Sequence, residues 1–392
     1  MKKVLFLING FGDLEWAAPL IKDCENNNIL VEIFFPSSSF RNILSTSTLL
    51  EKRLAHLNKA DLYSLFFDIN FLENFIRHIS KVRFIDKIVR RIIVFFLENF
   101  SAHYSTKLIK SSNPDFIFHD ISKDTSFRLS VKEKLIENKG EIFVHPHGSE
   151  VFVETAPDFI DVLPNYLLAA NEITASIYKK NYPNAIIIIS GIPKLREKWI
   201  PNKKRIQNLN IKKILFIARG PHHQDLSVES YEKIIEGLLE EVKKFENIQL
   251  IIKPHPRYGS KDLVRRLKFN KIKNWKIFEG SIMEITDDID LAISMWSTLI
   301  IDCISIGIPT IEYFIYECKP DRWLKEKNEV ISGYKKYGLA EHISEHKQLK
   351  DYFDMSNEEL KNLNSTSKTN LKKIHNIWYN DEIINHLTKN RV

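Results

Sequence analysis

The stretch that decides the fold runs from residue 250 to residue 312 and holds two short motifs. LIIKPHPR occupies residues 250–257, and LAISMWST occupies residues 291–298. In both, a short run rich in branched apolar residues is stopped by proline or polar residues, which is typical of a buried parallel strand. Open α/β sheets bind ligands at the carboxyl ends of their strands. The two motifs are therefore predicted to meet at one ligand-binding edge.

The first motif carries Lys253, His255 and Arg257 within five residues. Charge-assisted hydrogen bonds from such groups to a phosphate are among the stronger polar contacts. Pro254 and Pro256 fix the loop between them, which favours a preorganised anion site, with Pro256 as part of it. The alternative is a solvated basic loop.

The second motif places Ser294 at the end of a strand, and Ser297 and Thr298 at the start of the next predicted helix, residues 297–307. Hydroxyl groups and free backbone amides at a helix start can hold a phosphate without a metal. The alternative is that one of them is an ordinary helix N-cap.

Gly307 and Pro309 end that helix, and residues 310–312 begin another buried strand. Glu312 is predicted at the same sheet edge. A carboxylate there can accept hydrogen bonds from two ribose hydroxyl groups, as acidic residues do in dinucleotide folds.

The order Lys-Pro-His-Pro, Ser-x-x-Ser-Thr, Asp-x-x-x-x-Gly-x-Pro resembles the C-terminal domain of bacterial GT-B glycosyltransferases. The sialyltransferase, Kdo-transferase and capsule-polysaccharide groups are the most similar. The resemblance implies an α/β fold of two Rossmann-like domains facing a cleft, with C-terminal helices that cross back to the first domain. It also implies that His255, Ser297 and Thr298 bind the phosphate of a CMP-activated acidic sugar.

On this resemblance we expect a metal-independent glycosyltransferase that uses no cofactor. The acceptor would be a glycan or lipid-linked glycan of a bacterial capsule or lipopolysaccharide. Three alternatives stay open: a CDP-glycerol or CDP-ribitol polyol-phosphate transferase, a UDP-sugar 2-epimerase, and a non-catalytic glycan-binding scaffold.

Composition narrows the class of protein. The 392 residues suffice for two domains, and 44% hydrophobic content supports real cores. Three cysteines at spacings that match no zinc motif favour a reducing cytoplasm without structural metal. A net charge of +7 favours anionic partners, but no nucleic-acid-binding motif is present. We expect a cytoplasmic protein, and contact with the inner face of the cell membrane stays open.

The first domain is predicted to span residues 1–193. Its first strand leads into a glycine-containing turn with Asp13 and Glu15, and a later strand ends at Asp120. With His147, they are the candidates for the base that deprotonates an acceptor hydroxyl. For Asp13 and Glu15, capping of the following helix is the alternative. For His145 and His147, the alternatives are a hydrogen-bonded loop and a metal site.

Residues 49–110 are predicted to be a helical insert. A basic amphipathic helix within it, around residues 83–100, suits either domain packing or an anionic membrane surface.

The remaining boundaries follow from composition. Gly191 ends the first domain and is expected to let the donor approach the backbone closely. A charged linker is predicted over residues 194–210, the donor domain over 211–355, and a polar helical segment over 356–392. Arg219 lies in the first loop of the donor domain, where it reaches the donor phosphate or forms a surface ion pair.

Overall fold

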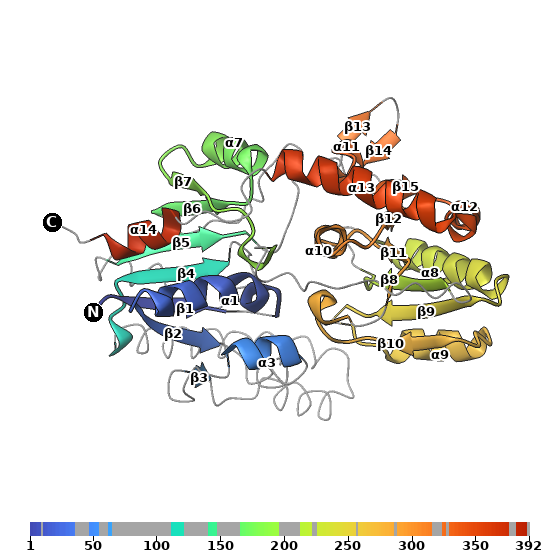
Figure 1. Cartoon of the computed structure of the whole chain (residues 1–392), viewed down its shortest axis with the longest axis horizontal. Coiled ribbons are helices and arrows are strands. Elements are labelled where there is room, and N and C mark those ends of the chain that lie inside the picture. Colours follow the sequence, from blue (N-terminus) through green and yellow to red (C-terminus); the bar gives the residue numbers. More distant parts are fainter. Residues whose placement is uncertain are drawn as a thin grey trace, which may run out of the picture. The chain divides into compact units, whose positions relative to one another are not determined.

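The computed structural model describes residues 1–8, 11–35, 47–54, 62–64, 111–120, 140–146, 165–195, 212–221, 226–255, 258–285, 288–315, 324–326, 329–375 and 382–389. The chain divides into two compact units. The first contains residues 1–148, 157–194 and 377–392, and the second contains residues 149–156 and 195–376. Each unit is built on its own parallel sheet, as the labels in Figure 1 show.

The sheet of the first unit has the described strand order β3-β2-β1-β4-β5-β6-β7, and every pairing is parallel. Its strands are β1 (Lys3–Leu7), β2 (Leu30–Phe35), β3 (Leu62–Ser64), β4 (Phe116–Asp120), β5 (Glu141–His145), β6 (Tyr166–Ala169) and β7 (Ile186–Ile189). A parallel sheet is covered on both faces, so its strands are apolar almost throughout. In β4 the polar residues are confined to the last two positions, His119 and Asp120.

The helices described in the first unit are α1 (Phe11–Asn26), α3 (Thr48–Leu54), α7 (Glu172–Asn181) and α14 (Glu382–Thr388), and the short η2 (Pro193–Leu195) follows at the boundary. Two of these helices, α1 and α7, start shortly after a strand ends. Helix α1 links β1 to its parallel neighbour β2 and buries Trp16 completely. Helix α7 begins at Asn171, whose side chain accepts a hydrogen bond from the Thr174 amide at 2.8 Å.

Helix α14 belongs to the first unit although it follows the whole second unit in the sequence. The Lys2 amine donates a hydrogen bond to the Leu387 carbonyl at 2.8 Å, and His386 Nε2 lies 2.7 Å from the Glu141 carboxylate. The predicted return of the chain to the first unit is therefore confirmed for α14, whereas the preceding helix α13 (Asn357–Ile374) stays in the second unit.

The predicted helical insert over residues 49–110 is helical only at its start in the part that the structure describes. Residues 62–64 form strand β3, which pairs in parallel with the edge of β2. Backbone pairing with an available sheet edge outweighs local helical periodicity over so short a stretch. The basic amphipathic segment at residues 83–100 lies outside the described residues.

The second unit has the strand order β10-β9-β8-β11-β12-β15, again parallel throughout. These strands are β8 (Lys212–Ile217), β9 (Ile248–Lys253), β10 (Trp275–Ile277), β11 (Leu291–Ser294), β12 (Thr310–Tyr313) and β15 (Glu341–Ile343), and β13 (Leu324–Glu326) pairs antiparallel with β14 (Glu329–Ile331). Strand order reverses direction at β8, between β9 and β11. This switch point is where sheets of this kind leave a crevice for ligands.

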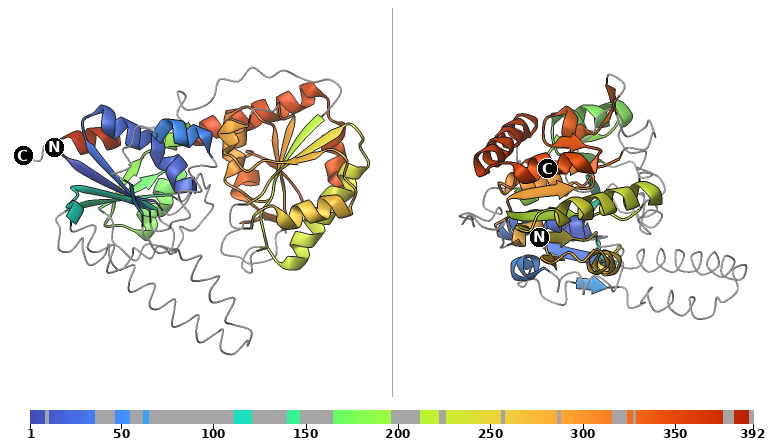
Figure 2. Two further views of the ribbon diagram at one scale, coloured as in Figure 1. Left: turned by 90° about the horizontal axis from the view of Figure 1, so that it is seen from below. Right: turned by 90° about the vertical axis from the view of Figure 1, so that its right-hand side faces the viewer.

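Helices cover both faces of the second sheet (Figure 2). They are α8 (Val228–Lys243), α9 (Lys261–Phe269), α10 (Leu299–Ser305), α11 (Gly333–Lys336), α12 (Leu349–Asp354) and α13, with short turns η4 (Ile282–Glu284) and η5 (His346–Gln348). Alternate residues of β8 face opposite ways. Phe216 packs in the cluster that contains Leu238 of α8, and Leu215 packs in the cluster that contains Cys303 of α10.

Lys194 is the last residue of its stretch in the first unit and Leu195 opens the second, at the start of the predicted linker; residues 196–211 lie outside the described part. Among the described residues, no helix combines the length and the apolar character needed to cross a membrane.

We predict that Leu387→Ala lowers the free energy of unfolding by about 2–5 kcal/mol, because it leaves a cavity where α14 packs. The Leu387 side chain is fully buried. Equilibrium urea unfolding of the full chain measures this change. Asn385→Ala, at an exposed position of the same helix, is the control and should change it by less than about 0.5 kcal/mol. Equal effects of the two substitutions would contradict the docking of α14.

Candidate functional site

The polar residues of the two motifs lie in one row across the second sheet. Strand register pairs Lys253 with Ile217, Ile217 with Ser294, Ser294 with Glu312, and Glu312 with His342. Register partners share a face, and Ile217 packs with the α10 side of the sheet. The row therefore lies at the carboxyl ends of adjacent strands on the α10 face, as the sequence predicted for Lys253, Ser294 and Glu312.

The loop after β9 carries the first cations. The Lys253 amine is buried and donates a hydrogen bond to the Gly280 carbonyl at 2.5 Å, while lying 5.6 Å from the centre of the Phe278 ring. Lys253 thus ties the β9 loop to the loop after β10. His255 is partly buried, and its ring centre lies 5.6 Å from that of Tyr258. Pro256 and Arg257 lie outside the described residues.

Arg219 lies in the loop after β8 and connects that loop to the second motif. Its Nη1 donates a hydrogen bond to the Trp296 carbonyl at 3.2 Å, and its guanidinium carbon lies 4.4 Å from the centre of the Trp296 ring. Trp296 has φ +42°, in the left-handed region that bulky residues rarely adopt. Such strain persists only where surrounding structure imposes it, and it concentrates at functional loops. The sequence analysis assigned Trp296 no role.

The two hydroxyl residues at the start of α10 differ in their bonding. Ser297 Oγ accepts a hydrogen bond from the Leu299 amide at 3.3 Å, so Ser297 performs the capping role that the sequence left open. Thr298 is the N-cap residue by position, but its side chain makes no capping hydrogen bond. Ser294 Oγ is fully buried and has no hydrogen-bond partner among the described residues.

Glu312 is fully buried and not open to solvent at the sheet edge. One carboxylate oxygen accepts a hydrogen bond from Ser332 Oγ at 2.7 Å and lies 3.5 Å from His342 Nδ1. Strand β15 and helix α11 close over this end of β12, because β15 pairs with β12 and Ser332 caps α11. The predicted contact of Glu312 with ribose therefore has no counterpart in this arrangement.

In the first unit, Asp120 and His145 are register partners at the carboxyl ends of β4 and β5, and both are buried. The His145 ring stacks on Trp16 at 4.2 Å between centres, and its Nδ1 lies 3.1 Å from the Pro146 carbonyl. A carbonyl only accepts, so Nδ1 carries the proton and Nε2 is left as an acceptor in the neutral ring. Asp13, in the first turn of α1, is also buried.

The other residues predicted in the first unit have separate surroundings. The Glu15 carboxylate lies 3.9 Å from the Lys194 amine. Gly191 has φ +69°, which explains a glycine there by backbone geometry alone. His147 lies outside the described residues.

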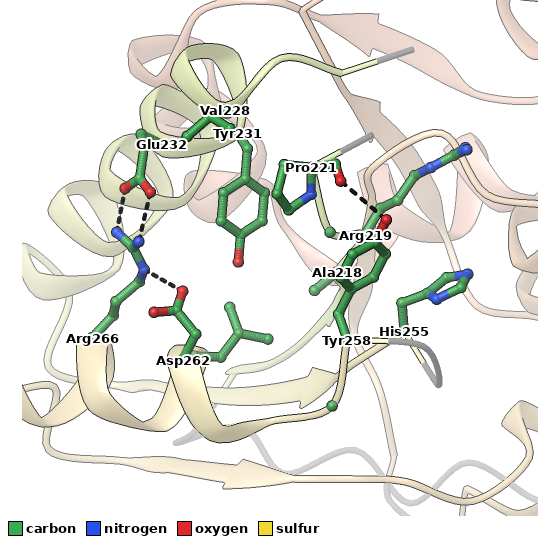
Figure 3. A pocket seen from close by; sticks show the side chains of 13 residues that line it. Ala218, Arg219, Pro221, Val228, Tyr231, Glu232, His255, Tyr258, Asp262 and Arg266 are labelled. Carbon is green, nitrogen blue, oxygen red and sulfur yellow. Dashed lines mark hydrogen bonds and ion pairs between the residues drawn. The ribbon is translucent and has the colours of Figure 1, made fainter. Parts of the chain in front are cut away.

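A pocket of about 310 Å³ opens beside His255, between the first turns of α8 and α9 (Figure 3). Tyr258 forms one wall. Its ring lies directly on Gly220, where an added Cβ would come within 2.2 Å of the ring, and its hydroxyl donates to the Pro221 carbonyl at 3.0 Å. No local sequence pattern signals this pocket, because its lining comes from two loops and two helices.

One group of side chains in the described part could hold a metal ion, namely Glu240, Glu241 and His346. The Lys244 amine already bonds the Glu241 carboxylate at 2.6 Å and lies 3.4 Å from that of Glu240. This internal cation supplies the charge that a metal would otherwise bring.

Solved structures share this fold over almost the whole chain. S. aureus MnaA with UDP matches with a TM-score of 0.64 and 12% identity, covering 99% of this chain and 96% of that one. UDP-GlcNAc 2-epimerase from Neisseria meningitidis, bound to UDP-GlcNAc, matches with a TM-score of 0.61 and 15% identity. The match covers 99% of this chain and 100% of that one. The spinosyn rhamnosyltransferase SpnG, complexed with thymidine diphosphate, matches with a TM-score of 0.54 and 12% identity. The match covers 99% of this chain and 100% of that one.

No protein-family model matches the sequence, and no curated protein matches it significantly. At such low identity the structural matches show the fold, and the prediction of an α/β, GT-B-like fold with two Rossmann-like units is confirmed.

We predict that Arg219→Met and Trp296→Leu are energetically coupled. Either substitution alone removes the stacking of the guanidinium on the indole, so a double-mutant cycle on unfolding free energy should give a coupling of about 0.5–1 kcal/mol. Arg265→Met, at an exposed arginine of α9, is the control partner and should be additive with Trp296→Leu. Additivity for Arg219 as well would show that the contact contributes nothing.

Proposed function

We propose that the chain is a glycosyltransferase that takes a sugar from a nucleotide-activated donor held by its second unit. One observation carries this proposal: the loops after β9, β8 and β11, three adjacent strands, bring His255, Arg219 and Thr298 to one carboxyl edge. Cations and a hydroxyl group at a switch point are suited to a diphosphate or phosphate. The nucleotides in the solved structures of similar fold support the same ligand class.

The proposed metal independence, donor sugar and acceptor rest on the sequence motifs. Arg219 and Lys253 supply positive charge and His255 a hydrogen-bonding ring nitrogen to stabilise the leaving phosphate, so the proposed reaction uses no metal. The motif resemblance favours a CMP-linked acidic sugar, whereas two of the structural neighbours contain UDP or a UDP-sugar. We place the acceptor among bacterial surface glycans and the reaction in the cytoplasm, at the inner face of the cell membrane.

The general base of the proposed reaction belongs to the first unit. Asp120 and His145 are adjacent at its sheet edge, and Asp13 is buried at the start of α1. His145 is the new candidate, because its Nε2 is an acceptor with no partner among the described residues. Asp13, Glu15, Asp120 and His147 remain the candidates that the sequence provides.

A nucleotide panel tests the donor site. Thermal unfolding with CMP, CDP, UDP, dTDP and GDP should show selective stabilisation, about 2.7 kcal/mol at one hundred times the Kd. His255→Ala should weaken binding of the preferred nucleotide about ten-fold or more, because a charge-assisted hydrogen bond to phosphate is lost. Binding of the matching uncharged nucleoside should not change.

His346→Ala is the matched control, since His346 is another partly exposed histidine of the second unit, on η5. A His255→Ala variant that binds nucleotides as well as the wild type does would rule out the donor-site assignment.

An epimerase is the second candidate, favoured by the higher TM-score to the N. meningitidis 2-epimerase than to the rhamnosyltransferase. An epimerase needs no acceptor and exchanges the hydrogen at C2 of the sugar with solvent. We predict that incubation with UDP-GlcNAc in D₂O leaves C2 free of deuterium, as read by NMR or mass spectrometry. Deuterium at C2 would replace the transferase proposal with an epimerase.

A further inference from the structure

The pocket between α8 and α9 has a polar wall that is already fully organised. Arg266 pairs with Glu232 through both terminal nitrogens, with Nη2 at 2.6 Å from Oε1, and its Nε donates to Asp262 at 2.7 Å. The Arg266 side chain is only 18% exposed. Planar ion pairs of this kind present fixed donors and acceptors at little further entropic cost.

Titration does not disturb this wall near neutral pH. Burial acts to raise the pKa of Asp262, but hydrogen bonds from Arg266 and Arg265 outweigh it and lower the pKa. Burial, together with the Asp262 charge, raises the pKa of Tyr231 to about 12. Tyr231 therefore offers a neutral hydroxyl, which points into the pocket between Asp262 and Tyr258 in Figure 3.

The opposite wall is formed by the Tyr258 ring. This ring is held against Gly220 yet leaves 47% of the residue exposed. Leu263 also lines the pocket, and Val228, on α8 beside Glu232, is 64% exposed. An exposed aromatic face suits a ligand with an apolar C–H face.

The two walls together select a class of ligand. The carboxylates of Glu232 and Asp262 repel anions, and their pairing with Arg266 leaves no surplus positive charge for a phosphate. Hydroxyl groups, which donate and accept, fit the polar wall, and the ring C–H groups of the same molecule fit Tyr258. A volume of about 310 Å³ is at the lower end for small-molecule sites.

We propose that this pocket binds a neutral monosaccharide unit, with its hydroxyl edge on Asp262, Arg266 and Tyr231 and its C–H face on Tyr258. Arg219 and His255, the groups proposed to bind phosphate, line the other end of the same pocket, because their side chains lie on the far side of Tyr258 from Tyr231 (Figure 3). The sugar comes either from a glycan chain or from the nucleotide sugar itself. The proposal does not depend on transferase activity.

Saturation-transfer difference NMR on the full chain tests the site, with the methyl glycosides of glucose, galactose and N-acetylglucosamine as probes. We expect binding of at least one glycoside to the wild type. Tyr231→Phe should weaken it about five-fold through the loss of one hydrogen bond. Tyr258→Ala should weaken it about five- to ten-fold through the loss of the ring.

Tyr352→Phe is the matched control, because the Tyr352 hydroxyl bonds Glu341 at 2.6 Å away from this pocket. It should leave glycoside binding unchanged. Binding of no glycoside, or equal binding by the wild type and by Tyr231→Phe, overturns the proposal. Tyr231→Phe keeps the ring, so the test stands even if Tyr258→Ala folds poorly.

Competition identifies the source of the sugar. A glycoside signal that persists with saturating UDP-GlcNAc supports a glycan unit in the pocket, and a signal removed by UDP-GlcNAc but not by UDP supports the donor's own sugar. Loss of the signal on addition of UDP alone places the glycoside in the nucleotide site and overturns the proposal. Failure of all nucleotides to bind, with glycoside binding intact, counts against the proposed donor site only.

Discussion

Burial of the second sheet on both faces is the constraint on which the candidate site depends. A parallel strand between two helical layers has little solvent for a polar side chain, so β11 is apolar until Ser294, and β9 is apolar from Leu250 until Lys253. Polar chemistry is thereby confined to the carboxyl ends of strands and the loops that follow. Parallel pairing then brings these ends together, although Lys253 and Ser294 are distant in sequence.

The loop after β8 lies between the loops after β9 and β11 and contacts both of them. Arg219 reaches the carbonyl and ring of Trp296 in the β11 loop. The next residue, Gly220, lies under Tyr258 of the β9 loop and admits no Cβ. Both neighbouring loops therefore contact the loop that carries Arg219. The left-handed Trp296 is consistent with this, since the contact to Arg219 helps to hold a conformation that its own backbone disfavours.

The sequence predicts what depends on local pattern, and this includes most of the strands, their parallel character and the places of Lys253 and Ser294 at strand ends. It does not predict what depends on residues far along the chain. Glu312 is buried because Ser332 and His342, which follow it by 20 and 30 positions in sequence, close over it. Residues 62–64 are a strand because an edge of β2 is available. The positive φ of Trp296 could not be predicted either, since no spacing rule signals such a conformation at a tryptophan.

Charge divides the second unit into two regions on either side of Tyr258. The whole chain carries +7, and Arg219 lies with His255 on one side of Tyr258, which favours anions there. On the other side, Arg266 is held by Glu232 and Asp262, so its charge is compensated within hydrogen-bonding distance. An anion gains little there and loses its hydration, whereas a neutral polyhydroxylated ring meets matched donors and acceptors. The ion pairs on α8 and α9 therefore make this end of the pocket a poorer place for phosphate than the end that Arg219 and His255 line.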